Sequence, residues 1–163
     1  MIWERLTMKK INKILLLTTL ILSTSLQGAI TCSSSVSNVG FGTYDILSVS
    51  DSTTFNIITV SCSRSQWWDN KKVKAKITLS DGNSNDFNNR YMSNGTDNLN
   101  YNLYKKNNYA TVFGGNKKKR VKFKLNNVGQ TYTKNRKIFG KLNAGQNVSS
   151  GFYSDTIIVS ISY

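Results

Sequence analysis

Apolar and polar residues alternate with a period of two along most of the chain, the pattern of β-strands that bury one face. The clearest runs are KVKAKITLS (residues 72–80), KRVKFKLNN (119–127) and GFYSDTIIVSISY (151–163). No segment after residue 29 keeps the 3.6-residue apolar spacing of an amphipathic helix long enough to form one. The sequence therefore predicts an all-β domain.

Clusters of Asn, Asp and Gly separate these runs. They occupy residues 81–86, 93–98, 113–117 and 143–146. These residue types tolerate positive φ angles and favour tight turns. Many short strands with regular turns predict an antiparallel β-sandwich. A length of 163 residues is enough for one domain with one modest core.

The last run reaches the end of the given sequence without a turn after it. Its apolar face is predicted to carry Tyr153, Ile157, Val159, Ile161 and Tyr163. Asp155 interrupts this face and needs a hydrogen-bond partner if it is buried, so we expect a structural hydrogen bond there. Ile158 interrupts the polar face.

The first 29 residues are interpreted as an export signal. A cationic start (residues 8–13) precedes a nine-residue apolar core (14–22), and small residues follow (23–29). A run of nine is shorter than the roughly 20 residues that span a bilayer as a helix. We predict a signal peptide over residues 1–29, with Met8 as an alternative start. The other interpretations are a buried helix or an uncleaved anchor. Candidate cleavage points follow Ser25, Gly28 and Ala29.

Cys32 and Cys62 are the only cysteines. In an oxidising compartment such a lone pair usually bridges, so we predict a structural disulfide. The chain has no His and no CxxC pair, so neither a metal site nor any other cofactor is expected.

Four blocks, in this order, carry a family resemblance. They are FGTYD (41–45), ITVSCS (58–63), RYMSNGTDNLNYNLYKKNNYATVFGG (90–115) and FGKLNAGQNVSSGFYSDTIIVSISY (139–163). Together they resemble the spore coat protein U domain of archaic chaperone–usher pilin subunits, over residues 30–163. Phe113 stands where the family usually has Trp.

The resemblance implies an incomplete immunoglobulin-like antiparallel β-sandwich that lacks one strand. A periplasmic chaperone would lend a strand, and a neighbouring pilin subunit would later replace it as the fibre passes an outer-membrane usher. The subunit would cross the periplasm and end on the cell surface. The predicted C-terminal strand would then be a docking edge. The alternative is a self-sufficient sandwich in which that strand is central.

The segment before Cys32 is short for a donor strand. Cleavage after Ser25 would leave only residues 26–31, whereas a typical strand alone has about 5–6 residues. We therefore expect a tip or otherwise terminal subunit. The alternative is a mis-assigned N-terminus.

The charge is strongly basic: 22 Lys and Arg against 8 Asp and Glu, a net +14. Such a charge favours non-specific attraction to polyanions, and no specific nucleic acid is expected. Candidate surface-binding residues are Trp67, Trp68, Lys117, Lys118, Lys119 and Arg120. In the alternative interpretation, the lysines lie on solvated outer faces and keep strand edges apart. The two Trp residues would then cap the open end of the core. The second function weighed is a self-contained secreted coat or surface-binding protein that attaches to polyanions.

Catalysis is not expected. Without His, a general base would have to be a carboxylate, and most Asp residues lie in turn-like stretches where they make local backbone bonds. No serine elbow, paired carboxylates or phosphate loop occurs.

Overall fold

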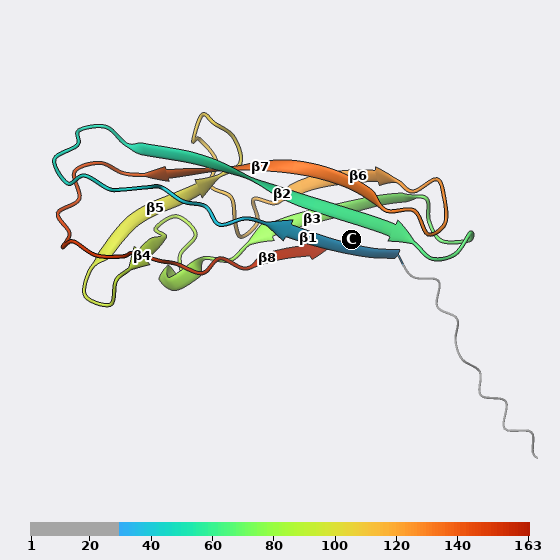
Figure 1. The fold of residues 1–163 in the computed structure, drawn as a ribbon. Coiled ribbons are helices and arrows are strands. Elements are labelled where there is room, and N and C mark those ends of the chain that lie inside the picture. Colours follow the sequence, from blue (N-terminus) through green and yellow to red (C-terminus); the bar gives the residue numbers. More distant parts are fainter. Residues whose placement is uncertain (1–29) are drawn as a thin grey trace, which may run out of the picture.

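The computed structural model describes residues 30–163, so the predicted signal peptide lies outside the described residues. Two antiparallel sheets make up this part of the chain (Figure 1). The five-stranded sheet has the order β1 (Ile30–Val36), β2 (Ser52–Arg64), β7 (Tyr132–Leu142), β5 (Asn98–Tyr104), β4 (Tyr91–Ser93). The three-stranded sheet has the order β6 (Lys119–Lys124), β3 (Lys72–Leu79), β8 (Val159–Ser162). Within residues 30–163 the only helical element is the 3₁₀ turn η1 (Gly82–Ser84).

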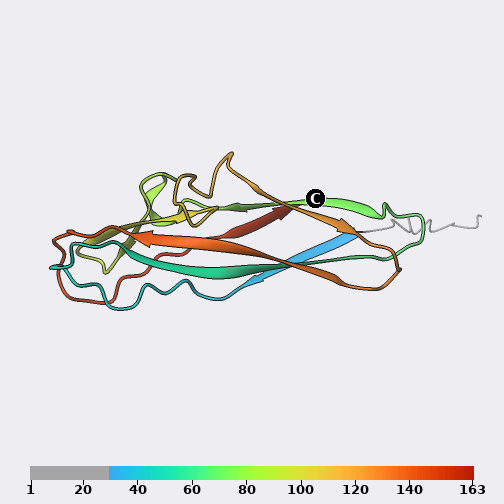
Figure 2. The same cartoon turned by 90° about the horizontal axis from the view of Figure 1, so that it is seen from above.

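The sheets form an elongated sandwich whose core lies between them (Figure 2). The predicted alternation in β3 is confirmed: its four apolar residues are buried and its lysines are exposed. The same holds in β6, where Val121 and Phe123 are buried between exposed Arg and Lys side chains. Binary patterning thus determines the inward face of these two strands.

The predicted disulfide is confirmed between Cys32 and Cys62. The two residues are direct register partners in the β1–β2 ladder. Within the described residues β1 pairs only with β2, so it is an edge strand. The disulfide therefore ties this edge strand covalently to its neighbour β2.

Replacing Cys32 and Cys62 together by Ala is expected to lower the free energy of unfolding by about 3–4 kcal/mol. The reason is that the bond spans a sequence separation of 30 residues and restricts the unfolded chain. Urea unfolding of the variant and of the wild type, with and without reductant, measures the difference. The reduced wild type should match the double variant, and a loss below about 1 kcal/mol would contradict the entropic account.

The C-terminal run differs from its prediction in one respect. It was expected to be a strand from Tyr153 to Tyr163, but ladder pairing covers only Val159–Ser162. Residues 153–158 keep the alternating exposure but run beyond the end of β3. Their backbone hydrogen bonds on that side are two between Ser154 and Ser93, one from the Ser80 N–H to the Ile158 carbonyl and one from the Ile158 N–H to Ser80 Oγ. β8 also lies at the edge of its sheet, not at the centre.

A fully buried arginine joins three segments of the sandwich. The Arg90 guanidinium donates to the Ser80 carbonyl at 2.6 and 3.1 Å, to Asn102 Oδ1 at 2.8 Å and to the Phe113 carbonyl at 3.0 Å. The ring of Phe87 lies 5.5 Å from its Cζ. Burial lowers the pKa of Arg90 from its ordinary value. These bonds link the end of β3, β5 and the connection that follows β5.

Candidate functional site: an open groove beside the C-terminal segment

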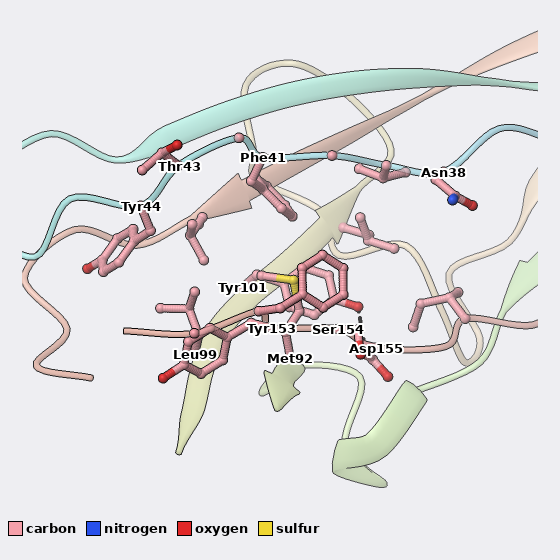
Figure 3. A pocket seen from close by; sticks show the side chains of 18 of the residues that line it. Asn38, Phe41, Thr43, Tyr44, Met92, Leu99, Tyr101, Tyr153, Ser154 and Asp155 are labelled. Atoms are coloured by element: carbon pink, nitrogen blue, oxygen red, sulfur yellow. Dashed lines mark hydrogen bonds between the residues drawn. The ribbon is translucent and has the colours of Figure 1, made fainter. Parts of the chain in front are cut away.

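A groove of about 1040 Å³ opens on one side of the sandwich (Figure 3). One wall is the segment that follows β1, residues 36–46, and the other is the segment that leads into β8, residues 148–159. Both segments run along the same side of the molecule in Figure 1. The groove therefore lies where the edges of the two sheets come together.

The floor of the groove is the hydrophobic core itself. It consists of the buried residues Ile58, Leu99, Tyr101, Leu103, Ile138 and Leu142, from strands β2, β5 and β7. Half-buried apolar side chains on the walls, among them Val39, Phe41, Tyr153 and Ile157, pack against the same core. The core is thus open along one side, where apolar side chains border an unfilled space.

The C-terminal wall presents a free strand edge. Within residues 30–163, the backbone groups of Tyr153 and Ile157 have no hydrogen-bond partner, whereas those of Ser154 and Ile158 bond to the opposite side. In an extended chain, successive backbone groups point to opposite sides, so the free groups point toward the groove. Unpaired strand edges of this kind accept another strand.

The opposite wall, the segment that follows β1, pairs with no strand of the described chain and is held by side-chain contacts instead. Asn56 Nδ2 donates to the carbonyls of Ser37 and Asn38 at 2.9 and 2.7 Å. Phe41 lies against Tyr101, with ring centroids 5.7 Å apart. These contacts fix the segment in place while leaving its backbone outside any sheet.

Asp155 has the structural hydrogen bonds that its place on an apolar face requires, as predicted. Its carboxylate accepts from the Tyr101 hydroxyl at 2.7 Å and from the Asn83 N–H at 2.9 Å. Burial, together with the Asp155 carboxylate, raises the pKa of Tyr101 well above its ordinary value, so the hydroxyl stays a proton donor. Gly82 lies so close that a Cβ there would clash with the Asp155 carboxylate. Asp155 therefore anchors the C-terminal wall to β5 and η1.

Three of the five predicted assembly residues, Tyr153, Ile157 and Val159, line the groove. Ile161 packs against the core from β8, and Tyr163 is exposed. Sequence reasoning did not assign Phe41, Met92 or Leu99 to this site. The only signal available for them was their place in the family blocks and in apolar runs.

The two predicted Trp residues lie in the turn between β2 and β3. Trp67 is 73% exposed and Trp68 is 52% exposed, with their rings 5.5 Å apart. Arg64 holds this turn: its guanidinium donates to the carbonyls of Gln66, Trp67 and Asn126. The Trp pair does not cap the groove, since neither residue lines it.

The predicted basic cluster does not lie on one face. Lys117 and Lys118 are exposed in the turn before β6, and Arg120 points outward. Lys119 instead lies between the rings of Phe113 and Phe139, 5.8 and 5.9 Å from their centroids. Burial there lowers the pKa of Lys119 to about 8.

Neither a metal centre nor a membrane-spanning helix is found in the described part of the chain. Residues 30–163 contain no group of three or more His, Cys, Asp or Glu arranged to hold a metal ion. No helix among these residues is long and apolar enough to cross a membrane.

An antiparallel sandwich whose core is open beside a free strand edge is an incomplete immunoglobulin-like fold. The sequence matches the family model of the Spore Coat Protein U domain over residues 18–160, and the chain belongs to this family. The family and fold that the sequence predicts are therefore confirmed.

Two of the solved structures that match come from pilus assembly. One is the chaperone–tip adhesion subunit pre-assembly complex, CsuC–CsuE, from archaic chaperone–usher Csu pili of Acinetobacter baumannii. It has a TM-score of 0.55 and 21% identity, covering 83% of this chain and 40% of that chain. This chain therefore spans less than half the length of that relative. A chaperone–tip adhesin complex of CFA/I fimbriae matches with a TM-score of 0.32 and 14% identity, over 77% of this chain and 42% of that chain. No curated protein matches.

Proposed function

We propose that the chain is a secreted structural subunit of a chaperone–usher pilus and that its groove receives a strand from another protein. The observation that carries this proposal is the open core beside the unpaired backbone of Tyr153 and Ile157. Strand addition needs both features: the edge supplies backbone hydrogen bonds, and the pockets select side chains.

The occupant is a strand with apolar residues at alternate positions. Its backbone pairs with the C-terminal wall, and every second side chain enters the floor formed by β2, β5 and β7. A periplasmic chaperone supplies this strand first. Another pilin subunit supplies it later, as the usher passes the fibre to the cell surface. In this proposal residues 1–29 are the signal peptide and residues 30–163 form the pilin domain.

A tip or terminal position is the finer part of the proposal. It is supported by β1, which pairs with β2 along its whole length and carries Cys32 of the disulfide. Residues 30–36 thus belong to the chain's own sandwich and are not free to serve as a donor strand. A donor would have to come from residues before Ile30.

Co-production with a periplasmic chaperone of the archaic chaperone–usher class tests this function. The wild-type chain should be recovered as a one-to-one complex, and without the chaperone it should oligomerise or be degraded. Ile157→Asp should abolish the complex because it puts a charge into the groove. Ile158→Asp is the matched control, since Ile158 is 64% exposed and does not line this groove.

A stable monomer produced without the chaperone would contradict the proposal and favour the self-contained coat or surface-binding protein. Equal behaviour of the two Asp variants would also contradict it. Mass spectrometry of the mature subunit in the same complex gives its N-terminus. A mature chain that begins well before Leu26 would remove the support for a terminal position.

Attachment to a surface through Trp67 and Trp68 is a second candidate function. It is supported by their exposure together on a turn that Arg64 braces. Amphipathic Trp side chains in such a place suit an apolar or interfacial surface.

A further inference from the structure

Strands β3 and β6 place like charges directly opposite one another. The register pairs are Lys72 with Lys124, Lys74 with Lys122 and Lys76 with Arg120. All six side chains are exposed on the outer face of the three-stranded sheet. We call these six residues the cation ladder.

The geometry of a sheet sets the spacing of the cation ladder. Neighbouring strands lie about 4.8 Å apart, and alternate residues on one strand about 6.7 Å apart. Like charges directly opposite across two strands destabilise a sheet. The ladder therefore costs stability in the free protein.

The described chain supplies no counter-charge to the cation ladder. No Asp or Glu occurs in β3, β6 or β8. The one salt bridge found within residues 30–163 joins Lys141, on β7, to Asp51. Three repeated pairs of cations thus face solvent without a partner from these residues.

Protection of a sheet edge explains only part of the cation ladder. Charged residues on an edge strand hinder edge-to-edge association, and β6 is an edge strand. β3 is also an edge on its other side at Lys72 and Lys74, because β8 pairs with it only from Lys76 to Leu79. Lys76 lies between β6 and β8 and has no edge to protect, and edge protection does not require cations directly opposite one another.

The strand positions of the outer face beside the ladder are polar, and Ile158, next to β8, is exposed on the same face. On β8, Ser160 lies opposite Thr78 and Ser162 lies opposite Lys76, and both serines are exposed. No outward residue of β3, β6 or β8 is Phe, Tyr or Trp, so the face offers no platform for stacked bases. The outward positions of β3, β6 and β8 carry no apolar side chain either, and the single exposed Ile158 beside Thr78 and Ser160 does not make the apolar face that interfacial binding to a membrane requires. Cations beside hydroxyl groups fit a chain of charged sugars.

We propose that the outer face of β3, β6 and β8 binds a linear acidic polysaccharide, with the cation ladder pairing with its repeated carboxylate or sulfate groups. This site is separate from the groove and goes beyond the proposed pilus function. Binding relieves the repulsion within the ladder, because each bound anion lies near two or more cations.

Binding to heparin, measured by calorimetry and by salt elution from a heparin column, tests the proposal. The ladder variant is Lys74→Gln, Lys76→Gln and Lys122→Gln in one chain. The matched control, Lys106→Gln, Lys134→Gln and Lys137→Gln, removes the same charge from exposed positions elsewhere. Wild type and variants are compared in the same form, alone or with the chaperone, so that failure of the pilus proposal does not affect the result.

The ladder variant should bind heparin at least about tenfold more weakly at 0.15 M salt, and the control less than about threefold more weakly. The ladder variant should also unfold at a higher temperature than the wild type, because two of the three opposed pairs of charges are gone. Equal weakening in both variants would show attraction by net charge alone and overturn the proposal. Tighter binding to single-stranded DNA of equal charge would also overturn it, since the ligand class would be wrong.

Discussion

A chain carrying its own donor strand is expected to unfold at a temperature at least about 10 °C above that of the unextended chain. The extension follows Tyr163: an Asn-Gly turn, then a strand with Val and Ile at alternate positions. The turn returns the added strand antiparallel to β8 and along residues 153–158. It would satisfy the free backbone of Tyr153 and Ile157 and fill the groove.

The physical reason is burial of apolar surface that is now open. Each fully buried Val or Ile side chain contributes about 1.5–3 kcal/mol, offset in part by the entropy of ordering the added strand. In a chain of this size each 1 kcal/mol raises the melting temperature by about 2–4 °C. Thermal unfolding followed by circular dichroism measures the shift, and size-exclusion chromatography should show a monomer.

The matched control has the same added residues in an order that breaks the alternation. It presents polar side chains to the floor of the groove and should give little or no gain. Ile157→Asp in the extended chain should remove most of the gain, and Ile158→Asp should not. An equal gain from both orders would contradict specific filling of the groove.

Arg90→Ala is expected to lower the free energy of unfolding by about 3–5 kcal/mol, the largest loss from any single substitution proposed for this chain. The change leaves the carbonyls of Ser80 and Phe113 without this donor in the interior, and Asn102 Oδ1 keeps only the Leu103 N–H. Each unsatisfied buried group costs about 1–3 kcal/mol, and the lost volume adds a cavity. Urea unfolding of the chaperone-free extended chain gives the value.

Two further variants define what Arg90 does. Arg90→Lys keeps the charge but loses the planar guanidinium that reaches three acceptors. Its free energy of unfolding should therefore lie between those of Arg90→Ala and the wild type. Arg136→Ala is the control, because the Arg136 side chain bonds only to the neighbouring Asn135 carbonyl in the described structure. A loss below about 1 kcal/mol for Arg90→Ala would show that water replaces the guanidinium at little cost.

Local pattern was sufficient for several features. Alternation alone predicts the inward faces of β3 and β6, because a strand has a period of two regardless of its neighbours. An apolar face interrupted by Asp155 predicts a structural hydrogen bond to this carboxylate. Two lone cysteines behind an apparent export signal predict the disulfide.

The burial of Arg90 could not be predicted from the local sequence. An arginine in an Asn-rich stretch is normally expected at the surface, yet this side chain is fully buried. Its acceptors come from residues 80, 102 and 113. Only the folded chain brings them together.

By itself, the sequence determined the fold class, the family, the disulfide and the inward residues of the main strands. Tertiary structure alone decided which part of the C-terminal run is paired. Val159–Ser162 pairs with β3, and residues 153–158 keep a free edge because β3 ends opposite Val159. It also decided that six cations stand in opposed pairs, because strand register depends on partners that are distant in sequence. The pattern within a segment shows which of its side chains face inward. Whether another strand pairs with that segment depends on the rest of the chain.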